Sequence, residues 1–430
     1  MVNRYVGAKH GSICIVSTSP IITDDSNVSI VEVPNEHDDV SSSELFTGFR
    51  VHGNEIRAKK RLLKPSSMKI AFVGNWKMRC GIATYNENLW PEIAKHVGDF
   101  KLFIERNDAP TSPINVIGDV AVPADKVLPC WKRGEPLSEL VAAIKAYDPD
   151  IVHIQHEFGI WPHAGHWLSL MGQLNDYNTF VTMHSVFHHR DKTIVEAAMP
   201  NIIVHLEGAK NVLKNEKGVP GNVFVIPHGC NLITNKDRLW NFYHTEHTMV
   251  QWGFGFRYKN FENAIETTNV LKAKYGDVFF TALFSESPFN AIGHQTYYDE
   301  LVQLTNRLKL NDNVAIIRGY QSPTSLDCYL RTNRIALFPY VGSIEHEVFG
   351  ASGAAREAMT KMLPIVTTNV NHFSDLPTLK GDTPEQLASE IDKMWSNPLA
   401  YKQQVERQAT YVEENSWSNV ALQHLKAFSK

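Results

Sequence analysis

Short, mostly apolar runs recur along this chain, and most of them end at glycine or at polar residues. Examples lie at residues 69–74, 150–154, 223–229, 279–283 and 314–320. Runs of this length and continuity are typical of parallel strands that are buried on both faces of a sheet. Because helical patterns separate the runs, the sequence predicts an α/β protein whose parallel sheets carry helices.

Size and composition limit the classes of protein that the chain can be. It has 430 residues, which suits two or three domains with sizeable cores. A formal net charge of −4 argues against binding that depends on a globally basic surface, but it leaves a local basic groove open. The five cysteines are scattered and show no CxxC spacing, so neither a disulfide framework nor a zinc site is indicated. We expect a cytoplasmic protein without integral membrane association, since no run suits a membrane span or a signal peptide.

Residues 1–66 differ in character from the rest. The β-type runs 12–16 and 28–33 flank Asp24-Asp25-Ser26-Asn27, which is favourable turn chemistry, so we expect a β-hairpin there. Residues 57–64 hold five cations, a dense basic cluster. Such a cluster is usually a solvated face of a linker. The alternative is a contact for an anionic acceptor such as nucleic acid or a lipid phosphate.

A small-residue loop at residues 350–355 runs directly into a helical pattern, which Pro364 closes before Ile365-Val366. Glycines let a backbone approach a ligand closely, and a helix N-terminus offers unpaired N–H groups at the positive end of its dipole. Together these features favour phosphate binding. Glu357 lies one turn into the helix, within reach of a ribose hydroxyl of a bound nucleotide. The alternative is a tight helix start with a surface glutamate.

Glu357-Ala358-Met359, followed by Leu363-Pro364-Ile365-Val366, resembles the EAM…PVV signature near the donor site of GT-B glycosyltransferases. This retaining family, group 1 or family 4-like, includes sucrose-phosphate and glycogen-type synthases. Further segments resemble it in the same order, at residues 79–89, 225–229 and 249–262. The resemblance covers residues 68 to about 430 and leaves the first 66 uncovered.

The resemblance implies two Rossmann-like, doubly wound domains that face a cleft. We expect an N-terminal extension at 1–66 and an acceptor-side domain at 67–230. A nucleotide-sugar-binding domain is expected at 231–405, and a C-terminal helix at 406–430 is expected to cross back to the first domain. No GxGxxG is present, so a dinucleotide fingerprint is absent.

The donor site is implied to lie mainly on the second domain. Lys259 matches the family's lysine that reaches the diphosphate, and Arg257 stands near the place of an arginine. Gly319-Tyr320 matches a turn whose backbone meets the nucleotide base. The residues expected to bind the donor are Gly81, Arg257, Lys259, Tyr320, Ser352, Gly353, Ala354 and Glu357.

Three residues are expected in the transfer step, namely His184, Lys259 and Glu347. His184 matches a strand-end histidine that hydrogen-bonds the transferred sugar. Lys259 would stabilise the negative charge that builds on the leaving diphosphate. The family has two glutamates eight positions apart, whereas Glu347 lies ten positions before Glu357. Either a two-residue insertion keeps Glu347 in the role, or amides of the 350–354 loop make the sugar contacts.

The acceptor is expected to enter from the first domain, at Arg79, His156 and Glu157. His156 and Glu157 follow an apolar run, and binding sites are built at such strand ends. The histidines show no HExxH or facial-triad spacing, so no metal site is expected. For His228, a hinge position and a cleft position are both open.

The resemblance implies an enzyme, a hexosyl- or pentosyltransferase. It would move a sugar from a nucleotide-diphosphate sugar to an acceptor hydroxyl, with retention of configuration and without a metal. No cofactor is expected besides the donor substrate, and the acceptor is expected to be a carbohydrate or small molecule. One alternative is a hydroxylated base in DNA, with residues 57–64 on the backbone. Another is a non-catalytic sugar or nucleotide binder on the same scaffold.

Overall fold

The computed structural model describes five short strands between residues 4 and 57 and most of the chain from residue 64 onward. The later described residues are 64–106, 122–190, 194, 196–233, 247–286, 291–342 and 347–430. Residues 58–63 of the basic cluster lie outside this part of the chain. The nucleic-acid contact proposed for that cluster therefore has no structural description.

The short strands pair differently from the prediction. β1 (Arg4–Lys9) pairs with β2 (Ser12–Ser17) in antiparallel orientation, and β2 pairs with β3 (Val28–Glu32) in parallel. The expected hairpin of residues 12–16 with 28–33 is therefore wrong. The antiparallel partner of β2 is β1, because the two residues that separate them suffice only for an antiparallel connection. β4 (Arg50–His52) and β5 (Glu55–Arg57) form a second antiparallel pair.

The first large sheet has seven parallel strands in the described chain, in the order β13-β12-β10-β9-β6-β7-β8. They are β6 (Lys69–Gly74), β7 (Asp99–Glu105), β8 (Val127–Trp131), β9 (Ile151–His156), β10 (Asn178–Met183), β12 (Asn201–Val204) and β13 (Asn222–Val225). The strand order changes direction beside β6. Ligands of doubly wound sheets bind at the carboxyl ends of strands at such a point.

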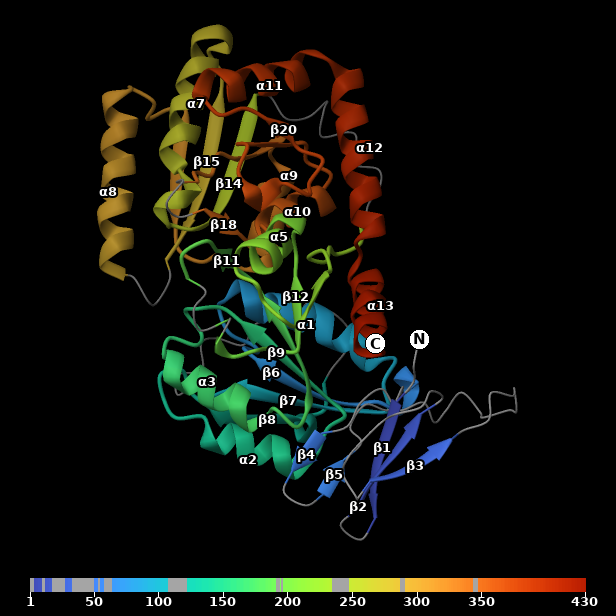
Figure 1. Cartoon of the computed structure of the whole chain (residues 1–430). Coiled ribbons are helices and arrows are strands. Elements are labelled where there is room, and N and C mark those ends of the chain that lie inside the picture. The colour runs from blue at the N-terminus through green and yellow to red at the C-terminus, as the bar shows by residue number, and fades with distance from the viewer. Residues whose placement is uncertain are drawn as a thin grey trace.

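Helices cover both faces of this sheet (Figure 1). α1 (Gly81–Ala94) and α13 (Trp417–Phe428) belong to one core together with Phe72. α2 (Ser138–Tyr147), α3 (Ala164–Gln173) and α5 (Glu207–Asn211) contribute to the other core together with Val73. Neighbouring residues of β6 thus enter opposite cores, because successive side chains of a strand point to opposite faces.

The second large sheet has six parallel strands in the described chain, in the order β16-β15-β14-β17-β19-β20. They are β14 (Thr248–Phe254), β15 (Phe279–Ser285), β16 (Val314–Arg318), β17 (Ile335–Phe338), β19 (Ile365–Thr367) and β20 (Leu379–Lys380). One face is covered by α7 (Phe261–Tyr275), α8 (Ala291–Arg307) and α11 (Pro384–Ser396). The other is covered by α9 (Pro323–Arg331) and α10 (Gly353–Thr360).

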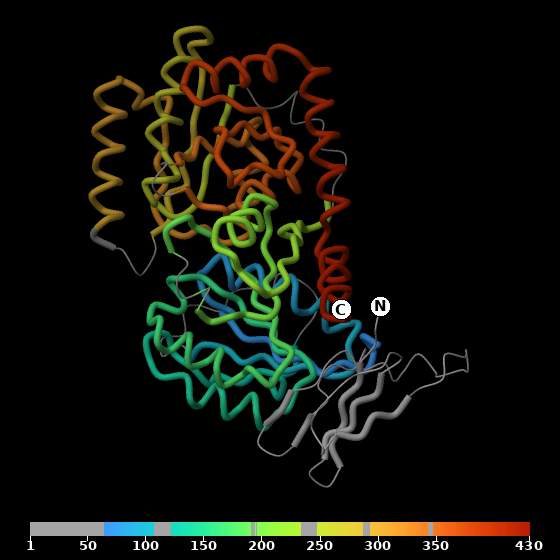
Figure 2. The backbone as a smooth tube through the Cα atoms, viewed as in Figure 1, coloured from blue at the N-terminus to red at the C-terminus, as the bar shows by residue number. Residues whose placement is uncertain are grey.

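The chain crosses between the two sheets more than once. Figure 2 traces it from the first domain into the second and back along α12 (Pro398–Glu414) to α13. At the crossing, the N–H of Cys230 donates to the carbonyl of Asn415 at 2.8 Å, and the N–H of Trp417 donates to the carbonyl of Cys230 at 3.1 Å. These bonds tie the outgoing and the returning segment together.

A small sheet also joins the domains. β11 (Val186–Phe187), which follows β10, pairs in antiparallel orientation with β18 (Val348–Phe349), which precedes the small-residue loop. Val186 is opposite Phe349, and Phe187 is opposite Val348. The end of β10 and the loop at residues 350–353 are therefore held close together.

The predicted fold class is confirmed, since two Rossmann-like α/β domains stand over a cleft. Strands β7 and β8 were not predicted. In β7, charged residues interrupt the apolar ones, in the sequence Asp-Phe-Lys-Leu-Phe-Ile-Glu, so no continuous apolar run marks it. Among the described residues, no helix has the length and apolar character that crossing a membrane requires.

Candidate active site

A cleft of about 940 Å³ lies between the two domains. The first domain lines it with residues that follow β9 and β10, among them Glu157, Ser185 and Arg190. The second domain contributes Tyr258 and His372, among others. Both polar and aromatic side chains therefore face a space that is large enough for a small ligand.

Lys259 ends a short 3-10 turn that follows β14. Its ammonium donates to the hydroxyl of Tyr340 and lies 4.1 Å from the centre of the Tyr340 ring. Burial lowers the pKa of Lys259 below that of a free lysine. Among the described residues, no carboxylate lies within ion-pair distance of this ammonium. This half-buried cation beside the cleft contacts the hydroxyl of Tyr340 and the rings of Tyr258 and Tyr340.

The backbone around Lys259 has two unusual residues. Gly253 has a φ of 143°, a backbone conformation that residues with a Cβ rarely adopt, and it lies beside the side chain of Lys259. Asn260 has a φ of 53°, in the left-handed region that glycine and asparagine tolerate best. Asparagine is therefore a suitable residue at this position.

The N-terminus of α10 lies next to Lys259. Ser352 is the N-cap of α10, and its hydroxyl accepts from the N–H of Ala355 at 3.3 Å. The same hydroxyl lies 3.4 Å from the hydroxyl of Tyr340, which also contacts Lys259. Tyr340 therefore connects the predicted phosphate-binding lysine with the helix start at Ser352, Gly353 and Ala354.

Gly350 closes the small-residue loop onto the first domain. A Cβ added at Gly350 would lie 2.8 Å from the carbonyl oxygen of His184, so only glycine fits without displacement. A Cβ at Gly353 would lie 3.6 Å from Nε2 of His228, a residue of the crossing segment. The loop thus lies close to His184, which follows β10, and to His228 of the crossing segment.

His184 follows β10, and its Nε2 lies 2.8 Å from the amide oxygen of Gln155. Its ring packs edge-on against Tyr85 at 4.8 Å and lies 5.3 Å from the ring of His205. Burial, together with neighbouring histidines, holds the pKa of His184 well below its usual range. The imidazole is therefore neutral near pH 7 and can act as a hydrogen-bonding group.

The other residues predicted for the donor site are spread around the loop. Glu357 lies one turn into α10 and has Lys361 as an ion-pair partner at 3.5 Å. Arg257 makes two hydrogen bonds to Glu300 of α8, at 2.7 and 2.8 Å, although it also lines the cleft. The guanidinium of Arg257 is thus already engaged by a carboxylate.

Two predicted residues meet across the domains. Arg79, in the loop before α1, lies with its guanidinium carbon 5.3 Å from the ring centre of Tyr320, which follows β16. Gly81 begins α1, and a Cβ added there would meet nothing within 4 Å. The start of α1 is therefore open, and the Arg79–Tyr320 contact stands beside it.

The two predicted acceptor residues after β9 differ in accessibility. Glu157 lines the cleft and accepts a hydrogen bond from the Ser185 hydroxyl at 2.6 Å, and burial raises its pKa. His156 is buried, with its ring 4.6 Å from that of Trp167 and 5.0 Å from that of Phe158. Burial lowers the pKa of His156 to about 3. The position of His156 suits the core better than a substrate contact.

Glu347 bridges the two domains. One oxygen lies 3.1 Å from Nε2 of His188, in the first domain, and the other accepts from the amide of Asn371, in the second. His188 also lies 2.6 Å from Glu216 through Nδ1. Both oxygens of Glu347 therefore have protein partners.

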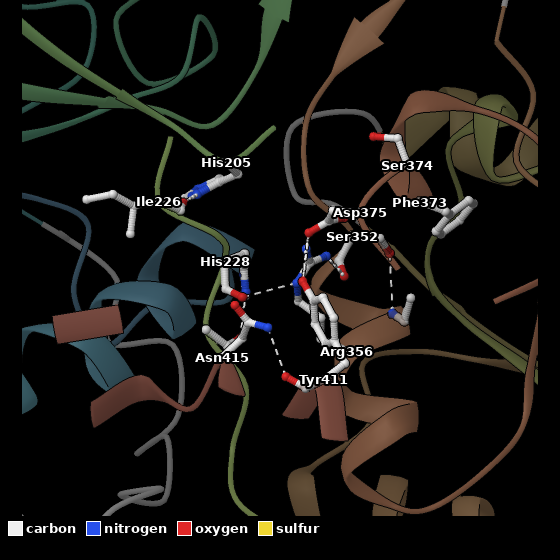
Figure 3. A network of polar contacts seen from close by, with 12 residues as sticks. His205, Ile226, His228, Ser352, Arg356, Phe373, Ser374, Asp375, Tyr411 and Asn415 are labelled. Carbon is white, nitrogen blue, oxygen red and sulfur yellow. Dashed lines mark hydrogen bonds and ion pairs between the residues drawn. The ribbon is translucent and has the colours of Figure 1, made fainter. Parts of the chain in front are cut away.

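Arg356 was not predicted as part of the site. It is 1% exposed, and its Nε donates to the carbonyl of His228 at 3.2 Å. Its Nη1 donates to the carbonyl of Ser352 at 3.1 Å, and its Nη2 contacts Asp375 and the hydroxyl of Tyr411. Figure 3 shows this guanidinium between His228 and the Asp375–Tyr411 pair. No local sequence signal marked it, since an arginine within a helix is ordinary in sequence.

Comparison with known proteins agrees with this description. The sequence model of Glycosyltransferase Family 4 matches residues 80–233. A comparison with curated protein sequences finds no significant match.

Solved structures resemble most of the chain. A sucrose-phosphate synthase from Thermosynechococcus elongatus is 18% identical, with a TM-score of 0.61, over 84% of this chain and 98% of that chain. Anabaena HepE in complex with UDP is 12% identical, with a TM-score of 0.63, over 84% of this chain and 100% of that chain. An E. coli structure described as trehalose-6-phosphate bound with UDP-2-fluoro glucose is 11% identical, with a TM-score of 0.63, over 84% and 99%. The chain therefore has the GT-B fold of these solved structures, and its first domain matches the model of Glycosyltransferase Family 4.

Proposed function

We propose that this protein transfers a sugar from a nucleotide-diphosphate sugar to an acceptor hydroxyl. The observation that carries the proposal is the contact chain from Lys259 through Tyr340 to Ser352, the N-cap of α10. It joins an ammonium that has no carboxylate partner in the described chain to a helix N-terminus. Both features attract phosphate, and they lie beside the interdomain cleft.

The residues support the following sequence of events. The bond between the anomeric carbon and the diphosphate oxygen breaks, and a bond from the acceptor oxygen to that carbon forms. The proton of the acceptor hydroxyl passes to an oxygen of the departing diphosphate. Lys259 and the amides of the 350–354 loop hold the negative charge that develops, which is an electrostatic contribution to the transition state. The neutral imidazole of His184 would hydrogen-bond the transferred sugar.

Retention of configuration and independence of metal are proposed from the family resemblance. Both are open to direct measurement. NMR of the product while it forms would identify the anomer, and an assay with and without EDTA would report a metal requirement. Inverted product would contradict the leaving-group base just described, and would direct attention to Glu157 as the base instead.

We propose a carbohydrate or another small hydroxyl compound as the acceptor. The cleft has about the volume that small-molecule sites have, and Glu157 with the Ser185 hydroxyl offers hydrogen bonds on the first domain's side. Anabaena HepE in complex with UDP and the sucrose-phosphate synthase share the fold. No described residue favours DNA as acceptor. A cytoplasmic location stays a prediction from the cysteine pattern.

Thermal stabilisation by a panel of nucleotide diphosphates and their sugars tests the donor proposal, because a ligand of the folded state raises the melting temperature. We expect one nucleotide to raise it clearly and Lys259→Ala to abolish the rise. Lys272→Ala in α7 is a matched control, since among the described residues that ammonium bonds only the carbonyl of Lys309. Absence of any rise in the unaltered protein would overturn the proposed function.

A further inference from the structure

An aromatic side chain of the second domain packs against the core of the first. Phe349, the last residue of β18, packs against the hydrophobic core that Val73, Ile154 and Leu206 share in the first domain. Its backbone pairs with Val186 of β11. We refer to the paired segments 186–187 and 348–349 as the interdomain clasp.

Gly208, in α5 of the first domain, forms the seat of this ring. A Cβ added at Gly208 would lie 2.5 Å from Cε1 and 2.6 Å from Cδ1 of Phe349. Real Cβ atoms do not approach carbon this closely, so any larger residue at position 208 must displace the ring. Gly208 lies within a helix, where alanine is otherwise the better residue. The glycine is thus explained by Phe349 rather than by the backbone of α5.

The clasp holds the residues that the proposed reaction needs. Gly350 follows Phe349 directly and packs on the carbonyl of His184. His184 lies two residues before Val186, the first residue of β11. At its other end, the small-residue loop leads to Arg356, which bonds the crossing segment at His228. The loop is therefore fixed to the first domain on both sides, and the donor-side amides cannot move independently of His184.

We propose that Phe349 is a positioning residue for sugar transfer: seated on Gly208 of the opposite domain, it holds the loop at residues 350–353 against the strand end at His184. This inference rests on the proposed function. When the Phe349 ring packs on Gly208, the donor and acceptor sides of the cleft are held together. When a larger residue at position 208 displaces the ring, this assembled state becomes a minor population. The apparent affinity for the nucleotide then falls in proportion to the fraction of assembled molecules.

The first test needs no ligand. Gly208→Ala and the larger Gly208→Leu displace the ring, while Gly172→Ala and Gly172→Leu in α3 are matched controls at an exposed helical glycine with nothing within 4 Å of the added carbon. Distances between fluorescent labels at Ala142 of α2 and Gln303 of α8 report the angle between the domains. We expect the Gly208 variants to broaden the distance distribution, with leucine more effective than alanine, and the controls to leave it unchanged. Equal distributions for all four variants would overturn the proposal.

The second test is a double-mutant cycle with Phe349→Ala. If Gly208→Ala acts only by displacing the ring, it has no further effect once the ring is removed. The readout is the affinity for the nucleotide diphosphate that stabilises the unaltered protein most, measured by calorimetry. We expect each single variant, and the double variant, to bind roughly tenfold more weakly, as is usual for coupled sites.

The two tests separate the possible failures. Additive effects of Gly208→Ala and Phe349→Ala would show that the two residues act independently. This result would contradict the proposal that Gly208 acts by accommodating the Phe349 ring. If no nucleotide binds the unaltered protein, the proposed function fails, whereas the label distances still decide whether Phe349 on Gly208 holds the domains. Circular dichroism of each variant confirms that both domains remain folded.

Discussion

Nε of Arg356 donates a hydrogen bond to the carbonyl oxygen of His228, 3.2 Å away, and this bond joins α10 to the segment through which the chain leaves the first domain. The same guanidinium bonds the carbonyl of Ser352, the residue that caps α10. The start of α10 therefore keeps a fixed relation to the crossing segment. A single buried side chain connects the predicted phosphate site with the place where the domains meet.

We expect Arg356→Met to lower the free energy of unfolding by about 3–5 kcal/mol, because it leaves the carboxylate of Asp375 without its buried partner. Urea denaturation followed by tryptophan fluorescence measures this loss. The double variant Arg356→Met with Asp375→Asn should recover part of it, since no charge is then left unpaired. Tyr411→Phe removes only one hydroxyl from the cluster, and should cost about 1 kcal/mol. Equal losses for all three would contradict the pairing.

Nucleotide binding should depend on pH through Lys259. Burial lowers the pKa of this ammonium, so the free protein loses the charge at a lower pH than an exposed lysine would. The charge is present below that pKa and disappears as pH rises through it, and affinity for a diphosphate should fall in the same interval. Calorimetric titrations from neutral to alkaline pH measure this. Lys259→Ala should bind roughly 10- to 100-fold more weakly at neutral pH and show no such decline.

The two glutamates near the loop should behave differently. Among the described residues, the carboxylate of Glu357 pairs only with Lys361, and Glu357 stands one turn into α10. Glu357→Gln should therefore weaken nucleotide binding roughly tenfold if its carboxylate accepts from a ribose hydroxyl. Both oxygens of Glu347 already have protein partners, His188 and Asn371. Glu347→Gln should therefore leave nucleotide affinity within about twofold. If Glu347→Gln weakened nucleotide binding more than Glu357→Gln did, Glu347 would instead match the first of the family's two glutamates.

The contact between His188 and Glu347 should weaken as pH rises. The hydrogen bond to Glu216 is the largest cause that raises the pKa of His188, and Glu347 adds to it, while the ammonium of Lys217 donates to the His188 carbonyl. Because the pKa of His188 is higher in the folded than in the unfolded protein, the stabilisation is complete below the unfolded-state pKa of about 6.5. It is lost as pH rises through the pKa of the folded protein. His188→Gln should remove this pH dependence of the melting temperature. Because the pair is partly exposed, high salt should reduce it as well.

Much of the fold was predictable from local signals. The runs at 69–74, 150–154 and 279–283 correspond to β6, β9 and β15, because strands buried on both faces need continuous apolar sequence. The helix after the small-residue loop was predicted, although it begins at Gly353, inside the segment 350–355 that was predicted as loop. The hairpin at residues 12–33 was wrong, since turn chemistry indicates where a chain reverses but not which strands then pair.

The candidate site was predictable only in part. Lys259 and the 350–355 loop carry recognisable local sequence. In the structure, the hydroxyl of Tyr340 contacts both Lys259 and Ser352. Tyr340, Arg356 and Gly208 carry none. A tyrosine at a strand end, an arginine in a helix and a glycine in a short helix are all ordinary in sequence. Each of these residues contributes to the site through contacts with residues that are distant in the sequence.

The sequence by itself determined the two α/β domains and the local form of each half of the cleft, because apolar periodicity, glycine and helix starts act over a few neighbouring residues. Tertiary structure alone decided which residues meet across the cleft. His188 and Glu347 are 159 positions apart, and Arg356 and His228 are 128 apart. Neither periodicity nor spacing encodes such pairs, since they arise only when both sheets have formed and the chain has crossed between them.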